Sequence, residues 1–293
     1  MTRAPVIVAM AAAASLAGPG AEAQTGNAVV TLRAVPAVPM RGTVVRLVVR
    51  SADSTEALLG VGGEAAGEPL HFEAAGRSYR ALAGIPLEGP DSLAVMLHIE
   101  GRRATDTLVI ALPLATPTYV NERLTVAPKY AKLDSATQAR VDREVSQARA
   151  VGRTAHETVR LWTGRFAAPR PGRVTSVFGT GREFNGEVTS RHVGTDFAGK
   201  IGAPVRAAGR GVVALVADFY LAGHAVYVSH GGGLVTGYFH LSRVDVAAGD
   251  TVARGQVIGG VGRSGRATGP HLHWIARYGA ITVDPLSLLR LTP

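Results

Sequence analysis

The sequence predicts a mainly β protein with an immunoglobulin-like N-terminal β-sandwich, a helical connector and an all-β C-terminal domain. Short β-branched segments punctuated by Gly, Pro and Asp fill the first part, one helical stretch follows, and glycine-rich, Val-rich segments make up the rest. At 293 residues the chain is long enough for about two domains. We expect the sandwich over 24–118, the connector over 119–164 and the second domain over 165–293.

The N-terminal domain is predicted from four short segments with roughly alternating apolar residues, at 29–33, 43–49, 93–99 and 107–114. His71 and His98 stand alone in this part of the sequence, with no cluster of potential ligands around them. We therefore expect a structural or substrate-positioning domain.

The connector is predicted to be helical over 135–151, where few Gly or Pro occur and Val141, Val145 and Ala148 recur at helical spacing. Ser135 is the expected cap of this helix. The second domain has short strands with tight glycine turns between them. They are expected over residues 211–216, 225–229, 234–238, 256–261 and 271–276.

The first 23 residues are typical of a secretory signal. Arg3 is followed by an apolar stretch over 6–17, and Ala21-Glu22-Ala23 fits a cleavage site. The stretch is short for a membrane span, so an uncleaved anchor is the less favoured alternative. We expect an exported protein of a bacterium, in the periplasm, outside the cell or in the cell envelope, with no stable membrane insertion.

Composition restricts the chemistry of any site. The chain has no cysteine, which excludes disulfide scaffolds and thiolate metal sites and leaves His, Asp and Glu as metal ligands. The net charge is +9, and residues 165–293 carry 14 Lys and Arg against seven Asp and Glu. A basic domain suits an anionic partner. For an exported protein this indicates the envelope polymer rather than nucleic acid, for which no recognition motif is present.

Six of the nine histidines lie between positions 192 and 273. His192 and Asp196 are four residues apart, while His271 and His273 are two apart and so share one face of a strand. Two histidines and a carboxylate form a common zinc set, whose fourth position, left to water, makes the site catalytic. Spacing alone leaves open which two of the six histidines bind the metal.

Three segments resemble, in order, the signatures of the M23 family of zinc endopeptidases (lysostaphin and LytM-type). They are His192-Val193-Gly194-Thr195-Asp196, Tyr238-Phe239-His240-Leu241 and Gly269-Pro270-His271-Leu272-His273. Phe178-Gly179, the Gly-Gln-x-Ile-Gly segment at 255–259 and Val283-Asp284-Pro285 also resemble that family. The resemblance is strong over about 165–290 and weaker before it.

The resemblance implies antiparallel sheets that form an open groove, with one Zn²⁺ per chain bound by His192, Asp196 and His273. It implies that His271 and His240 face the metal-bound water and the reacting carbonyl. The implied activity is hydrolysis of peptide bonds in the stem peptides or cross-bridges of peptidoglycan, by zinc-activated water with acid/base help from histidine. Our hypothesis makes His271 the general base and His240 the oxyanion stabiliser, with exchanged duties as the alternative.

Three further residues are candidate substrate contacts. Tyr238 precedes His240 by two and is expected on the same strand face, either at the substrate or as a packed aromatic. Asn185 resembles a residue upstream of the first ligand in related sequences and is also a good turn former. His224 stands where the family more often has asparagine.

Two other classes of function compete with the enzyme. Some relatives have lost zinc ligands and act by binding and activating other wall hydrolases, but all five matched positions are intact here. A structural zinc site normally has four protein ligands and is often rich in thiolates, which fits this sequence poorly. The sequence predicts no particular protein partner.

Overall fold

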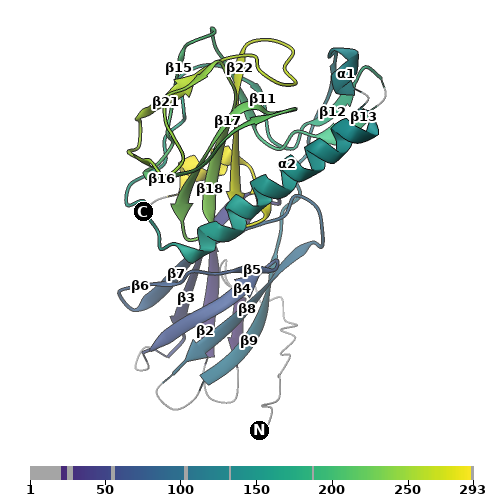
Figure 1. Ribbon diagram of the computed structural model, residues 1–293. Coiled ribbons are helices and arrows are strands. Elements are labelled where there is room, and N and C mark those ends of the chain that lie inside the picture. Colours follow the sequence, from purple (N-terminus) through teal and green to yellow (C-terminus); the bar gives the residue numbers. More distant parts are fainter. Residues whose placement is uncertain are drawn as a thin grey trace. The chain divides into compact units, whose positions relative to one another are not determined.

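The computed structural model describes residues 21–24, 29–53, 57–101, 105–131, 133–186 and 188–291. The chain divides into two compact units, residues 1–117 and 118–293 (Figure 1). Of the expected signal sequence, residues 1–20 lie outside the described residues. None of the described helices is long and apolar enough to span a bilayer.

The first unit consists of two antiparallel sheets. One has the strand order β1-β2-β3-β7-β6 and the other the order β5-β4-β8-β9. The strands are β1 (Ala21–Gln24), β2 (Val29–Val35), β3 (Val44–Ser51), β4 (Gly60–Ala65), β5 (Glu68–Pro69), β6 (Glu73–Ala75), β7 (Ser78–Gly84), β8 (Ser92–Glu100) and β9 (Thr105–Pro113).

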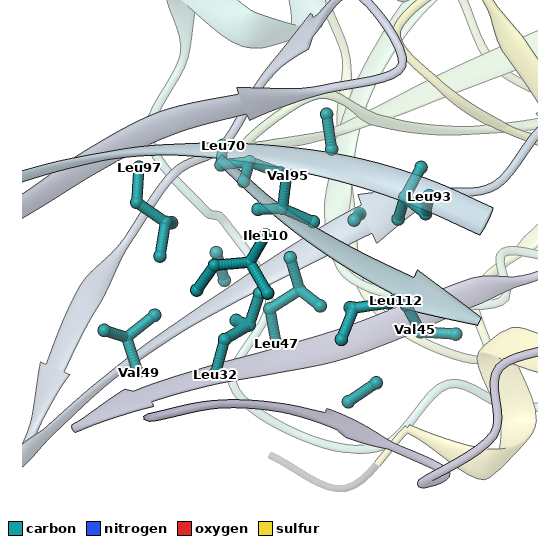
Figure 2. Close-up of a cluster of buried hydrophobic side chains, with 14 of the residues drawn as sticks. Leu32, Val45, Leu47, Val49, Leu70, Leu93, Val95, Leu97, Ile110 and Leu112 are labelled. Atoms are coloured by element: carbon teal, nitrogen blue, oxygen red, sulfur yellow. The ribbon is translucent and has the colours of Figure 1, made fainter. Parts of the chain in front are cut away.

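One aliphatic core joins the two sheets (Figure 2). Every second residue of β8 is buried, and Leu97 lies opposite Leu108 of β9 in the antiparallel register. Leu47 of the other sheet belongs to the same buried cluster. The period of two residues places one face of each sheet in the core, so the predicted β-sandwich follows from the alternation of the sequence.

The second unit begins with β10 (Asn121–Leu124), the short helix α1 (Pro128–Ala131), the long helix α2 (Ser135–Thr154) and a short 3-10 helix, η1 (Ala155–Glu157). Its remaining elements are β11 (Val174–Ser176), β12 (Gly181–Phe184), β13 (Val188–Arg191), β14 (Thr195–Ala198), β15 (Pro204–Arg206), β16 (Gly211–Phe219), β17 (Gly223–Gly231), β18 (Leu234–Leu241), β19 (Arg243–Val244), β20 (Thr251–Val252), β21 (Val257–Gly260), β22 (His271–Tyr278), β23 (Ile281–Val283) and η2 (Pro285–Arg290).

Helix α2 packs against the main sheet of this unit. Ala148 and Val151 join a buried cluster with Tyr227 and Phe239 of strands β17 and β18. The helix begins at Ser135 as predicted, but its N-cap is Asp134, whose carboxylate accepts a hydrogen bond from the Thr137 N–H at 2.7 Å. The expectation that Ser135 caps the helix is therefore wrong, because the residue before it supplies the acceptor.

The main sheet has eight strands, with the path β11-β14-β22-β18-β17-β16-β20 and β23 paired to β22. Two three-stranded sheets, β10-β12-β13 and β15-β21-β19, complete the unit. All the strand pairs of the main sheet are antiparallel. The predicted mainly β fold class, with antiparallel sheets in the second part of the chain, is confirmed.

Candidate metal centre

Strand pairing brings two of the three predicted ligands together. Strand β14 lies antiparallel to β22, and the register places Asp196 directly opposite His273. His192 lies in the segment between β13 and β14, four residues before Asp196. Asp196 and His273, which are far apart in the sequence, are therefore neighbours because the register of two adjacent strands pairs them.

The ligand atoms of these three residues form a compact group. The Nδ1 atom of His273 lies 2.7 Å from Asp196 Oδ1 and 2.9 Å from His192 Nε2, and His192 Nε2 lies 3.1 Å from Asp196 Oδ1. All three residues are buried, and among the described residues they form the one group of three or more side chains suited to hold a metal ion.

The chemistry of this group fits a divalent metal such as zinc. The Nδ1 atom of His192 lies 2.9 Å from the Val177 carbonyl and 3.0 Å from Ser176 Oγ. A hydrogen bond from Nδ1–H to that carbonyl turns the Nε2 lone pair toward the centre, as is usual for histidine ligands. Two imidazoles and one carboxylate are a set typical of catalytic zinc sites.

Gly194 allows the two strands to approach at this level. A Cβ atom on Gly194 would lie 2.6 Å from the Trp274 carbonyl oxygen and 2.7 Å from His273 Cε1. Both distances are shorter than side chains tolerate, so a larger residue here would displace His273. The glycine inside the first motif is thus required by the close packing against His273 and Trp274.

His271 and His240 lie beside the three ligands. The His271 ring centroid is 4.8 Å from that of His240, and His271 Nε2 lies 3.8 Å from Asp196 Oδ1. Main-chain carbonyls hold both rings: His271 Nδ1 lies 2.8 Å from the Gly269 oxygen and His240 Nδ1 lies 2.7 Å from the Ser264 oxygen. With Nδ1–H donated to a carbonyl, each neutral ring keeps a free lone pair on Nε2.

A bulge turns His240 toward this cluster. Its φ angle is +60°, and the pairing of β17 with β18 shifts register between Tyr238 and Leu241. His240 therefore lies near His273, with ring centroids 5.9 Å apart, while Phe239 stacks on the same His273 ring at 5.4 Å.

Burial sets the protonation of the site. It lowers the pKa of His273 to about 4 and that of His240 to about 3, with charges on His271 and His273 adding to the effect at His240. Burial raises the pKa of Asp196, but His273 and the hydrogen bonds from His192 and His273 outweigh it, so that this pKa lies below its ordinary value. Neutral imidazoles beside an ionised carboxylate are the forms that bind a metal.

An outer network supports the ligands, and the sequence did not reveal it. Arg182 Nη2 donates to Asp196 Oδ2 at 2.6 Å, and Ser176 Oγ donates to Glu122 Oε2 at 3.1 Å. Glu122 lies opposite Arg182 because β10 pairs in parallel with β12. No spacing in the sequence marks this pairing, since residues 122 and 182 meet only through the fold.

The three candidate substrate contacts have structural partners, and Tyr238 is in the interior. Tyr238 is fully buried, and its hydroxyl accepts from the Ala208 N–H at 2.8 Å and lies 2.9 Å from Thr236 Oγ1. Of the two expected alternatives, a contact at the substrate or a packed aromatic, the structure shows the packed aromatic, and the left-handed His240 interrupts the alternation of β18. The structure therefore places Tyr238 in the interior and not at the site.

Asn185 and His224 also have structural contacts. The Asn185 side chain pairs with the main chain of Val126, accepting from its N–H at 3.0 Å and donating to its carbonyl at 2.9 Å. The His224 N–H donates to Ser264 Oγ at 2.9 Å, next to the carbonyl that orients His240. Neither residue lines the cavity that opens over the predicted ligands.

A cavity of about 660 Å³ opens over the centre. Its lining includes all three predicted ligands together with His240 and His271. Apolar side chains of α2 and the main sheet line another part, among them Val141, Val145, Phe219, Tyr227 and Ile275. The predicted ligands and both flanking histidines are therefore accessible from one cavity.

Part of the chain is similar to known proteins. The family model for peptidase family M23 matches residues 190–285. Peptidoglycan DD-endopeptidase ShyA of Vibrio cholerae is 49% identical over 83 residues, which cover 28% of this chain and 19% of that protein. DD-carboxypeptidase/endopeptidase Mpg of Neisseria meningitidis is 44% identical over 102 residues, covering 35% of this chain and 24% of that protein.

A solved structure covers more of the chain. A peptidase M23 from Pseudomonas aeruginosa is 27% identical, with a TM-score of 0.62, and the match covers 86% of this chain and 95% of that one. The chain spans about a fifth to a quarter of the length of the curated relatives named above. Their likeness covers about a third of this chain.

Proposed function

We propose that this chain, which belongs to peptidase family M23 through residues 190–285, is a zinc-dependent endopeptidase that hydrolyses peptide bonds in peptidoglycan stem peptides or cross-bridges. One observation carries the proposal: the His192, Asp196 and His273 ligand atoms and two further histidines line a single cavity. The names of the relatives, two of which are peptidoglycan DD-endopeptidase and DD-carboxypeptidase/endopeptidase, support the substrate class.

His192, Asp196 and His273 would hold one Zn²⁺, which when bound supplies Lewis-acid polarisation of the scissile carbonyl and a water of lowered pKa. His271 is the proposed general base. Its side chain is 16% exposed, its Nδ1 is held by the Gly269 carbonyl, and its Nε2 lone pair is available beside Asp196. A fixed, partly solvated imidazole of this kind can take a proton and deliver it to the leaving amine.

His240 is the proposed oxyanion stabiliser. Its Nδ1–H is committed to the Ser264 carbonyl, so Nε2 can donate only when the ring is an imidazolium. Burial keeps the pKa of His240 at about 3 before substrate enters. A negative charge that develops beside the ring in the transition state would raise that pKa and favour the donor form.

The setting of the activity is part of the proposal. The expected signal over residues 1–23 and the basic character of residues 165–293 favour an exported protein that acts on the anionic cell wall. We propose the periplasm or the outer surface of a bacterium as its location, and peptidoglycan peptides as its partners.

The test combines metal content with release of peptides from isolated peptidoglycan. The purified full chain is assayed beside His271→Ala and His240→Ala, with His98→Ala, an exposed histidine of the first unit, as matched control. We expect one zinc per chain in all four proteins. Peptide release should fall about 100- to 10,000-fold in the two site variants and stay unchanged in the control.

Other outcomes discriminate among the alternatives. A chain that binds zinc and peptidoglycan without releasing peptides would contradict the enzyme and favour a protein that binds the wall. Full activity in His240→Ala would reject the oxyanion role. A chain without zinc would reject the ligand assignment.

A further inference from the structure

The cavity over the metal centre has an excess of positive charge. Its lining contains five arginines, Arg173, Arg182, Arg191, Arg266 and Arg277, but only three acidic residues, Glu122, Glu144 and Asp196. Each acidic residue already has a partner. Asp196 pairs with Arg182, Glu122 accepts from Ser176, and Glu144 bonds Arg140 and the Tyr220 N–H.

Arg266 lines this cavity and has no ion pair with a carboxylate among the described residues. It is half-buried, and its guanidinium lies 4.2 Å from the centroid of the Phe184 ring. Within the described part of the chain, no carboxylate or carbonyl accepts a hydrogen bond from that guanidinium. Burial, followed by the charge of Arg182, lowers the pKa of Arg266, although a guanidinium remains charged at neutral pH.

The segment that carries Arg266 is fixed to the reacting groups. The Arg266 N–H donates to the Leu221 carbonyl at 2.8 Å. Two residues earlier, the Ser264 carbonyl holds the His240 ring and Ser264 Oγ accepts from the His224 N–H. Gly265 lets the segment approach closely, since a Cβ there would lie 2.5 Å from the Leu221 oxygen. The backbone of Arg266 is therefore fixed two residues from the carbonyl that holds the His240 ring, and its guanidinium lies over the Phe184 ring.

We propose that Arg266 binds a carboxylate of the substrate, so that the site selects peptides with a free carboxylate near the scissile bond. The inference rests on the proposed function and names the chemical class of its substrate more closely. A planar guanidinium offers two parallel donors that match a carboxylate, and the Phe184 ring beneath it restricts its orientation. The incoming carboxylate supplies the counter-ion that Arg266 lacks among the described residues.

Three synthetic cross-linked stem peptides test the inference. One has all its carboxylates free, one has only its C-terminal carboxylate converted to the amide, and one has only its side-chain carboxylates converted. Each is given to the wild-type full chain and to the Arg266→Gln, Arg266→Lys and Arg263→Gln variants. Arg263 is the matched control, because it is exposed on the same segment and does not line the cavity.

We expect one of the two amidations to lower the wild-type kcat/KM about 10- to 100-fold, the loss of one charge-assisted hydrogen-bonded pair. The amide that matters identifies the C terminus or a side chain as the source of the carboxylate. Arg266→Gln should lose a similar factor on the free peptide and almost nothing on that amide. Arg266→Lys should fall in between, and Arg263→Gln should behave as wild type, with equal zinc content throughout.

A wild type that cleaves all three peptides equally would overturn the inference. So would an Arg266→Gln variant that loses the same factor on every peptide. Binding of the same peptides to the metal-free full chain, measured by calorimetry, separates this result from failure of the proposed function. If no peptide is cleaved but the wild type binds the free peptide more tightly than Arg266→Gln does, the carboxylate site is supported and the peptidase activity is rejected.

Discussion

In the first unit, strand β8 alternates between buried aliphatic side chains and more exposed ones, whereas all eight residues of β18 in the second unit are buried. The first core consists of Leu, Ile, Val and Ala. The second unit buries His192, Asp196, His230, His240 and His273 along with its apolar residues.

Burial has a different role in each of the two units. An aliphatic core stabilises its fold through the removal of apolar surface from water. Buried imidazoles and carboxylates cost free energy unless they are hydrogen-bonded or bound to a metal. In the second unit each of these groups has such a partner, so burial there holds chemistry in place and the apolar neighbours supply stability.

The largest effect should come from removal of a ligand. His273→Ala takes away one of three ligand atoms and should abolish zinc binding, with peptide release at least about 1,000-fold lower, because Lewis-acid catalysis is worth several kcal/mol. Metal analysis and the peptidoglycan assay check it. If the His273→Ala protein still binds one zinc per chain, His273 is not a metal ligand. The buried polar residues of the second unit would then serve packing, as the aliphatic core of the first unit does.

The next effect belongs to the aliphatic core. Leu97 is fully buried, and Leu97→Ala should lower the free energy of unfolding of the first unit by about 2–5 kcal/mol through the cavity that it leaves. Denaturant unfolding measures the loss. Leu59→Ala is the matched control, because Leu59 is 53% exposed and should cost little. Equal losses in the two variants would contradict the assigned core, and zinc content should stay unchanged in both.

Support from behind the ligands should matter less than the ligands themselves. Arg182→Gln removes the donor to Asp196 Oδ2 and should weaken zinc affinity about 10- to 100-fold, the usual range for partners of a metal ligand. Competition with a chelator gives the affinity. Arg173→Gln is the control, since Arg173 is exposed and also lines the cavity. Unchanged affinity in Arg182→Gln would show that strand pairing alone orients Asp196.

Some features of both units could be predicted from the sequence. The β8 strand was predictable because alternation follows directly from a sheet with one buried face. The candidate metal ligands were predicted through motif resemblance, and the structure brings those residues together. In both cases a local pattern carries the information.

Features that depend on tertiary pairing were not predictable. Glu122 meets Arg182 only because β10 joins β12 in parallel, and no period in the sequence encodes that register. Tyr238 was expected on the strand face of His240, at the substrate or as a packed aromatic. It is packed in the interior, and the left-handed backbone of His240 interrupts the strand periodicity. A bulge of this kind changes the meaning of the pattern without changing the residues.

The smallest expected effect concerns His230, a buried histidine outside the metal centre. Its Nδ1 bonds the Arg210 carbonyl at 2.8 Å, its Nε2 lies 2.8 Å from Thr236 Oγ1, and burial lowers its pKa to about 4. The unfolded chain, with an ordinary pKa of about 6.5, therefore binds more protons between pH 6.5 and 4. Stability should fall as pH falls through this window.

From pH 7.5 to pH 5.5 the cost should be about 1 kcal/mol for this one group. His230→Gln keeps polar atoms in place but cannot titrate, so its unfolding free energy should depend less on pH by that amount, although its stability at pH 7.5 is lower. Denaturant unfolding at the two pH values, with chelator present to exclude proton release by metal, measures the difference. Identical pH dependence in both proteins would mean that His230 takes up its proton in the folded state. The buried interior of the second unit would then accommodate a charged imidazole despite its two hydrogen bonds.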